Sequence, residues 1–125
     1  MNNNKSQINH IVVFKYKPNV TIDKQAEILN KFLDLKNECK KDGKTYINSI
    51  VGGNCSNSIE GLDQGFHQVF IITFSSQSDF EYYVGRPFYK SFDPKHDEFK
   101  KFVTPYLAVG ENDKTIGAMI FDFKI

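Results

Sequence analysis

Two short apolar runs limit most strongly what this chain can fold into. They are Val69-Phe70-Ile71-Ile72, within residues 66–74, and Met119-Ile120-Phe121, within residues 117–123. Successive residues of a strand point to opposite faces of a sheet, so both faces of these two predicted strands are apolar. Because the helices of a small domain cover only one face, we expect a second copy of the chain to pack on the other face and form a homodimer.

Alternating and helical spacings predict the first half of the fold. Residues 8–16 carry apolar side chains on both faces and are expected to form a strand. Thr21 suits a helix N-cap, and apolar residues then recur at spacings of three and four, which predicts an amphipathic helix that closes at Asp42 and Gly43. A further strand is expected over residues 46–51.

Two more helices are predicted before the last strand. Ser78 with Glu81 fits a capping box, and Asp93 directly before Pro94 combines an N-cap with a proline at the first helical position. The second of these helices is expected to end near Val103. The resulting order, β-α-β-β-α-α-β, predicts an α+β, ferredoxin-like fold: a four-stranded antiparallel sheet with helices on one face.

Composition excludes several classes of function. The chain has 125 residues and a formal net charge of +1, which suits one domain without the basic excess that nucleic-acid binding needs. Its apolar runs are far shorter than the roughly 20 residues of a membrane-spanning helix, so we expect no membrane association. We expect a cytoplasmic protein, with a polar, disordered tail over residues 1–7 and one domain over residues 8–125. Cys39 and Cys55 are too few for a metal cluster, and no nucleotide or metal motif occurs, so no metal or cofactor is expected.

The three histidines are candidates for a site. His10 shares a predicted strand face with Val12 and Phe14, and His67 is expected to share one with apolar neighbours, so both should point into apolar space. His96 lies in the first turn of a helix, whose positive end should keep the ring neutral and able to accept a proton. The alternatives are purely structural: His10 and His67 satisfied by neighbouring groups, and His96 closing the helix start.

Tyr83 and Arg86 are further candidates. Tyr83 follows Phe80 by one helical turn, so its hydroxyl should face inward, although a tyrosine on an apolar stripe is more often part of the core. Arg86 could bind a carboxylate, although a single loop arginine is more often a solvated surface group.

Several blocks of the sequence resemble one known family. Residues 8–17 and 52–70 are similar to the opening and middle strands of the stress-responsive dimeric α/β-barrel (Dabb) family. Tyr82-Tyr83 followed by residues 93–99 resembles its helix with tyrosine, proline and histidine, and Asp122-Phe123 resembles its closing strand. The resemblance implies a stress-associated dimer of ferredoxin-like subunits, and some members are similar to polyketide cyclases with His and Tyr in a cavity. Residues 84–92 lengthen the usual link between that tyrosine and that histidine.

Two main functions follow as hypotheses. The first is a stress-responsive dimer that binds a small apolar ligand, with His10, His67, Phe14 and Arg86 as ligand-binding residues. The second is a cofactor-independent, polyketide cyclase-like enzyme, in which His96 removes a proton next to a carbonyl and Tyr83 hydrogen-bonds the oxyanion. His10 and His67 would orient its substrate. A monooxygenase of the wider barrel group is a third possibility and rests on fold analogy alone.

Overall fold

The computed structural model describes residues 7–55 and 59–125. Its elements are β1 (Ile8–Phe14), α1 (Ile22–Glu38), β2 (Lys40–Lys41), β3 (Lys44–Thr45), β4 (Ser49–Asn54), β5 (Gln68–Phe74), α2 (Gln77–Val84), α3 (Pro94–Val103), two short 3₁₀ helices (Thr104–Tyr106 and Glu111–Asp113) and β6 (Ala118–Lys124). Apart from Gln7, the expected N-terminal tail lies outside the described residues.

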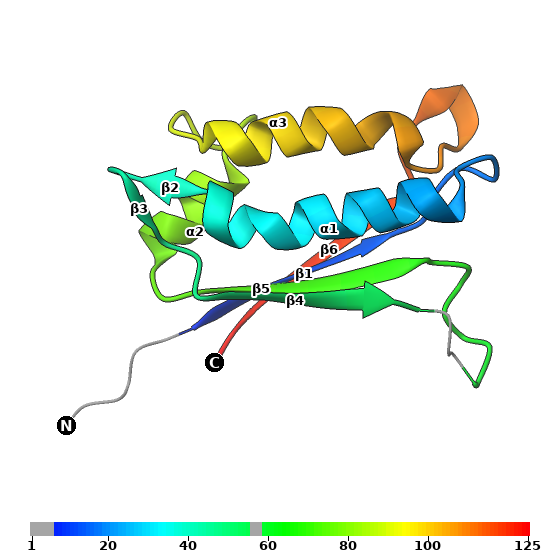
Figure 1. Cartoon of the computed structure of the whole chain (residues 1–125), viewed down its shortest axis with the longest axis horizontal. Helices are drawn as coiled ribbons and strands as arrows, with labels where there is room; N and C mark the ends of the chain where they lie inside the picture. The colour runs from blue at the N-terminus through cyan, green and yellow to red at the C-terminus, as the bar shows by residue number, and fades with distance from the viewer. Residues whose placement is uncertain (1–6, 56–58) are drawn as a thin grey trace.

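The main sheet is antiparallel and has the strand order β4-β5-β1-β6. Helices α1 and α3 lie next to each other over one of its faces, and no helix of the described residues packs against the other face (Figure 1). The predicted α+β, ferredoxin-like architecture is therefore confirmed. No helix in the described part of the chain is long and apolar enough to cross a membrane.

Two predicted helix boundaries are wrong, and the strands predicted over residues 46–51 and 66–74 instead span Ser49–Asn54 and Gln68–Phe74. Helix α1 ends at Glu38, because Asp42 (φ 53°) and Gly43 (φ 77°) form the turn of a β2–β3 hairpin. Positive φ at both central residues is the geometry of a tight hairpin turn, and an Asp-Gly pair serves it as readily as it ends a helix. Helix α2 is capped by Ser76, whose Oγ accepts from the N–H of Asp79 at 3.1 Å, and Ser78 instead lies inside the helix.

The core fills the space between the sheet and the helices. Phe32 of α1 stacks on Phe70 of β5 with 4.0 Å between ring centroids, and Phe99 of α3 meets Phe32 edge-on. All three rings are buried, which fixes both long helices against the middle of the sheet. Helix α3 covers the inward side chains of β1 and β6 only in part. These side chains form one wall of a cavity.

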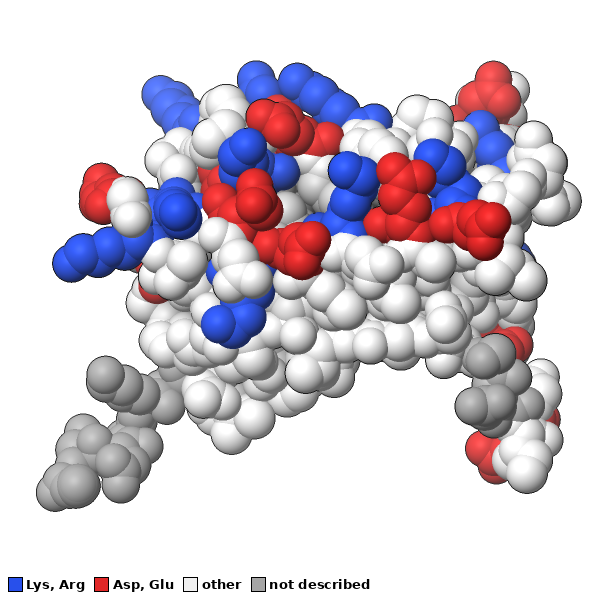
Figure 2. Space-filling view, viewed as in Figure 1, with Lys and Arg blue, Asp and Glu red and all other residues white. Residues whose placement is uncertain are grey.

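The opposite face of the sheet is apolar and exposed. The strand register places Val51, Ile71, Ile11 and Phe121 in one row across all four strands. Phe121 and Val51 are 54 % and 58 % exposed. Charged side chains gather over the helices, and the lower part of the molecule, where the sheet lies, is largely free of charge (Figure 2). The sequence thus predicts correctly that both faces of the sheet are apolar and that helices cover one.

Candidate functional site

A cavity of about 310 Å³ lies between the inward face of β1 and β6 and the helix α3. Val12 and Phe14 of β1 and Ala118 and Ile120 of β6 form one wall, and Phe99 and Val103 of α3 are among the residues of the other. The polar or charged residues that line it are His10, His96, Arg86, Lys100, Thr104 and Thr115. A small apolar space with a few polar groups is typical of a ligand-binding site.

His10 is held by a carboxylate on the neighbouring strand. The β1–β6 register sets His10 directly opposite Asp122, and its ring Nδ1 is hydrogen-bonded to Asp122 Oδ1. A carboxylate only accepts hydrogen bonds, so Nδ1 carries the proton and donates it. In the neutral ring, Nε2 is then left with its lone pair, and it has no partner among the described residues. Phe80 and Tyr83 pack edge-on against this ring and fix its orientation.

His96 is held in the same way by a backbone carbonyl. Asp93 caps α3, its Oδ1 accepting from the N–H of Lys95 at 2.8 Å, and His96 follows in the first turn. The Nδ1–H of His96 donates to the carbonyl oxygen of Tyr83, so its Nε2 also keeps a lone pair. Burial lowers the pKa of His96 to about 3, and the nearby Lys100 ammonium acts in the same direction. The ring is therefore neutral near pH 7, as expected, with burial as the main cause.

The Tyr83 ring stacks on the His96 imidazole from the core side. The two ring centroids are 3.7 Å apart, and the side chain of Tyr83 is 1 % exposed. Its hydroxyl is buried without a hydrogen-bond partner in the described structure, and burial raises the pKa of this phenol well above 10. Tyr83 is absent from the cavity wall, so it positions His96 from within the core.

His67 lies elsewhere. Strand β5 begins at Gln68, and His67 precedes it, with its Nδ1 accepting from the N–H of Tyr16 at 3.1 Å. It lines a different hollow, together with Gln25 of α1, Asn54 and Cys55. The cavity therefore brings together His10, His96, Phe14 and Arg86 of the expected site residues and leaves out His67 and Tyr83.

The lengthened link between α2 and α3 closes one side of the cavity. Gly85, with φ 61°, turns the chain directly after α2, and a Cβ there would lie 2.6 Å from Phe92 Cβ. Arg86 then stacks over the ring of Phe92 at 4.0 Å and donates to Asp97 Oδ2 at 2.7 Å. The residues that the link adds to the cavity wall are Arg86, Pro87 and Phe88.

Two residues of the site have no counterpart among the sequence-based candidates. Asp122 is recognisable only once β1 and β6 are paired in register with His10. Lys100 lies four residues after His96 on α3, so helical periodicity places both on one side and could have indicated Lys100.

Among the residues that the structure describes, no group of three or more His, Cys, Asp or Glu side chains is arranged to hold a metal ion.

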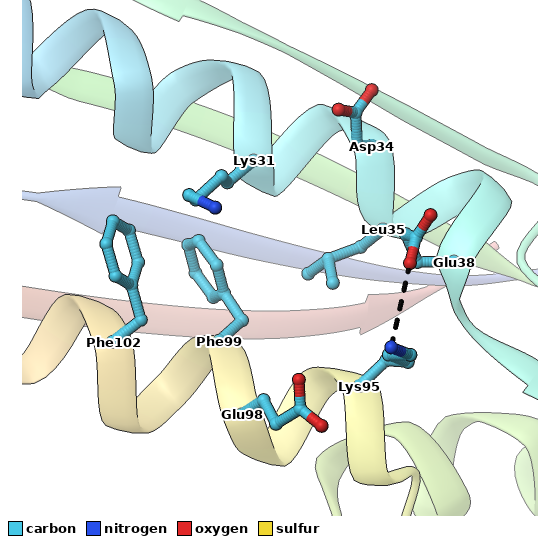
Figure 3. Close-up of a pocket in the computed structure, with 8 residues that line it drawn as sticks. All are labelled: Lys31, Asp34, Leu35, Glu38, Lys95, Glu98, Phe99 and Phe102. Atoms are coloured by element: carbon cyan, nitrogen blue, oxygen red, sulfur yellow. Dashed lines mark ion pairs between the residues drawn. The ribbon is translucent and has the colours of Figure 1, made fainter.

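A third hollow, of about 280 Å³, lies between α1 and α3 and has a different character. Figure 3 shows Lys95 pointing toward Glu38 across it, and Nζ and Oε1 of this pair are 3.9 Å apart. Its other charged residues are Lys31, Asp34 and Glu98. Both signs of charge are mixed around it and no histidine is present, so it suits an apolar ligand less well.

Comparison with known proteins agrees with this architecture. The model of the stress responsive A/B barrel domain (Dabb) family matches residues 8–125. The chain belongs to the Dabb family. No curated protein sequence matches the chain.

Several solved structures have the same fold as this Dabb protein. A hydroxynitrile lyase from Passiflora edulis is similar with a TM-score of 0.71 and 19 % identity, over 97 % of this chain and 94 % of that one. The Arabidopsis thaliana protein At3g17210 gives 0.69 and 22 %, over 93 % and 92 %. A dimeric ferredoxin-like protein of unknown function from Thermobifida fusca gives 0.69 and 15 %, over 98 % and 93 %. At these identities the likeness extends to the fold alone.

Proposed function

We propose that this Dabb protein is a homodimer in which each subunit binds a small apolar ligand in the cavity between His10 and His96. The observation that carries the proposal is the chemistry of the cavity wall: apolar side chains surround two imidazoles whose Nδ1–H groups are already engaged. In its neutral form, each ring then offers Nε2 only as an acceptor. The ligand that fits is an apolar molecule with a hydroxyl or another hydrogen-bond donor.

The dimer follows from the exposed face of the sheet. Ile11, Ile71 and Phe121 form part of an apolar surface that no described element covers. Burying such a surface against a second copy removes it from water, at about 25 cal/mol per Å² of apolar area. Ferredoxin-like proteins of the same fold from Jannaschia and Thermobifida fusca are described as dimeric, which supports this arrangement.

A neutral fluorescent dye, 1-aminoanthracene, tests the ligand site. We expect it to bind with an emission shift and to be displaced by small apolar alcohols. Ala118→Phe, which places a ring on the cavity wall, should abolish binding. The matched variant Ala26→Phe places the same ring at the hollow near His67 and should leave binding intact. If Ala26→Phe loses binding and Ala118→Phe keeps it, the ligand binds in the hollow near His67 and the proposed site is wrong.

A cofactor-independent, polyketide cyclase-like enzyme is the second candidate, and the His10–Asp122 pair supports it. Nε2 of His10 would take a proton from a carbon next to a carbonyl, and the Asp122 carboxylate would stabilise the imidazolium that forms. With a pKa of about 3, His96 is a weak base at neutral pH, so His10 suits the role of general base better. The hydroxynitrile lyase with this fold is compatible with enzymatic use of the cavity.

Deuterium exchange tests this second candidate. The methyl protons of 4-methylacetophenone next to its carbonyl should exchange with D₂O faster in the presence of the protein, as followed by proton NMR. His10→Gln should lower the added rate by on the order of 10²-fold. His67→Gln, which alters the separate hollow between His67 and α1, should leave the added exchange rate unchanged. An added rate that survives in His10→Gln would rule out His10 as the base.

A further inference from the structure

One N–H of the Lys100 ammonium has no acceptor among the described residues. Its Nζ donates to the carbonyl oxygens of Val84 at 3.0 Å and of Arg86 at 2.9 Å. An ammonium group carries three N–H donors, so one remains, and Nζ has no other partner among the described residues. The side chain is half-buried and lines the cavity. The two carbonyls therefore fix a positive charge at the cavity wall with one donor unused.

Among the described residues, the nearby Asp97 forms ion pairs with Arg86 and Lys101 and none with Lys100. Asp97 Oδ2 accepts from Arg86 at 2.7 Å and lies 3.4 Å from Nζ of Lys101. A shallow hollow outside the cavity mouth is lined by these four charged residues, three cations and one carboxylate, together with prolines and a threonine. Asp122, the other carboxylate near the cavity, is engaged by His10. The mouth thus has an excess of positive charge.

The arrangement separates the cavity into an apolar part and a charged part. His96 and Lys100 of α3 and its C-cap Thr104 follow one another at intervals of four residues, and all three line the cavity. Val12 and Phe14, on β1, provide an apolar wall. A ligand with an apolar body against the sheet would bring a polar head toward Lys100 and Arg86.

We propose that the ligand of this cavity is a small apolar acid: besides the hydrogen-bond donor that suits the two histidines, it carries a carboxylate that accepts the third N–H of Lys100. Arg86, which uses one guanidinium nitrogen for Asp97, adds positive charge and further donors at the mouth. This inference rests on the proposed ligand-binding function and names the class of ligand.

Competition against 1-aminoanthracene at pH 8 and low salt tests the inference with octanoate and octanamide. The two compounds share the same alkyl chain and differ in the charge of the head group. Octanoate should displace the dye at about tenfold lower concentration, because a charge-assisted hydrogen bond replaces a neutral one. The preference should weaken as NaCl is added, whereas octanamide should show little dependence on salt.

Lys100→Met keeps most of the aliphatic stem and removes the charge, so it should abolish the preference for octanoate. Lys95→Met removes a lysine of the same helix that lines the hollow between α1 and α3, and it should leave the preference for octanoate unchanged. Equal displacement by the two compounds, a preference without salt dependence in the wild-type protein, or a preference that survives in Lys100→Met would overturn the inference. If the dye binds and neither compound displaces it, this inference fails and the cavity proposal stands. If the dye does not bind, both fail.

Discussion

The ring of Tyr83 lies flat against the imidazole of His96, with an interplanar angle of 10° and 3.7 Å between the centroids. The stack, together with the hydrogen bond from His96 to the Tyr83 carbonyl, fixes the ring that faces the cavity. The tyrosine hydroxyl contributes nothing visible to this arrangement, because it is buried and has no partner in the described structure.

Tyr83→Phe should therefore leave the free energy of unfolding unchanged or raise it by up to about 1 kcal/mol, since it removes an unpaired buried hydroxyl. Tyr46→Phe is the matched comparison, because the Tyr46 hydroxyl donates to Asp93 Oδ2 at 2.6 Å. Its loss should cost about 1–3 kcal/mol. Urea unfolding measures both. Equal costs would mean that the Tyr83 hydroxyl has a partner in solution.

The low pKa of His96 should make stability depend on pH. The unfolded chain binds a proton at this residue near pH 6.5 and the folded chain only near pH 3. Between these values the unfolded state holds more protons, so the free energy of unfolding falls as the pH falls, by up to about 1.4 kcal/mol per pH unit from this residue.

His96→Asn isolates that contribution, because an amide can still donate to the Tyr83 carbonyl but does not titrate. Wild type should be the more stable protein at pH 8, and the difference should shrink steadily toward pH 4. Urea unfolding at several pH values gives the comparison. A constant difference would show that His96 is not neutral through burial.

The three histidines should differ in tautomer. His10 and His96 should carry the proton on Nδ1, which donates to Asp122 and to the Tyr83 carbonyl. His67 should carry it on Nε2, because its Nδ1 accepts from the N–H of Tyr16. Nitrogen-15 NMR at high pH distinguishes the two tautomers of a neutral imidazole. The same tautomer at all three positions would contradict these hydrogen bonds.

A charge at the centre of the open sheet face should prevent dimer formation. Ile71 lies in the middle of the apolar row, so Ile71→Lys should give a monomer at micromolar concentration in sedimentation velocity. Ile22→Lys introduces the same charge at an exposed position of α1, on the helical side, and should remain dimeric. The proposed interface is wrong if wild type sediments as a monomer or if Ile71→Lys stays a dimer.

The order of the four strands of the main sheet and of the three α-helices could be predicted, because periodicity or a cap marks them, whereas the short β2–β3 hairpin was missed. The end of α1 could not be predicted, since Asp42 and Gly43 suit both a helix end and a hairpin turn, and only tertiary structure decides between them. His67 was misplaced for a related reason. It precedes β5 by one residue, so the loop and not the strand alternation sets its direction.

The cavity was predictable only in part. Strand alternation placed His10 on the inward face, and the N-cap and proline located His96 in the first turn of α3. The partner of His10 depends on strand register across 112 residues, which a single sequence does not reveal. The role of Arg86 depends on the path of the link between α2 and α3, and its residues carry no periodicity that would predict this path.

Strand β6 has unusually little freedom to change. Ala118, Ile120 and Asp122 face the cavity side, and Met119 and Phe121 alternate with them on the bare side of the sheet. Each residue of this stretch therefore belongs either to the ligand cavity or to the proposed contact with a second subunit. A substitution that reshapes one surface leaves the other unchanged, but a shift of the strand by one residue would exchange the two sets and damage both at once. We therefore expect an insertion or deletion within β6 to be poorly tolerated.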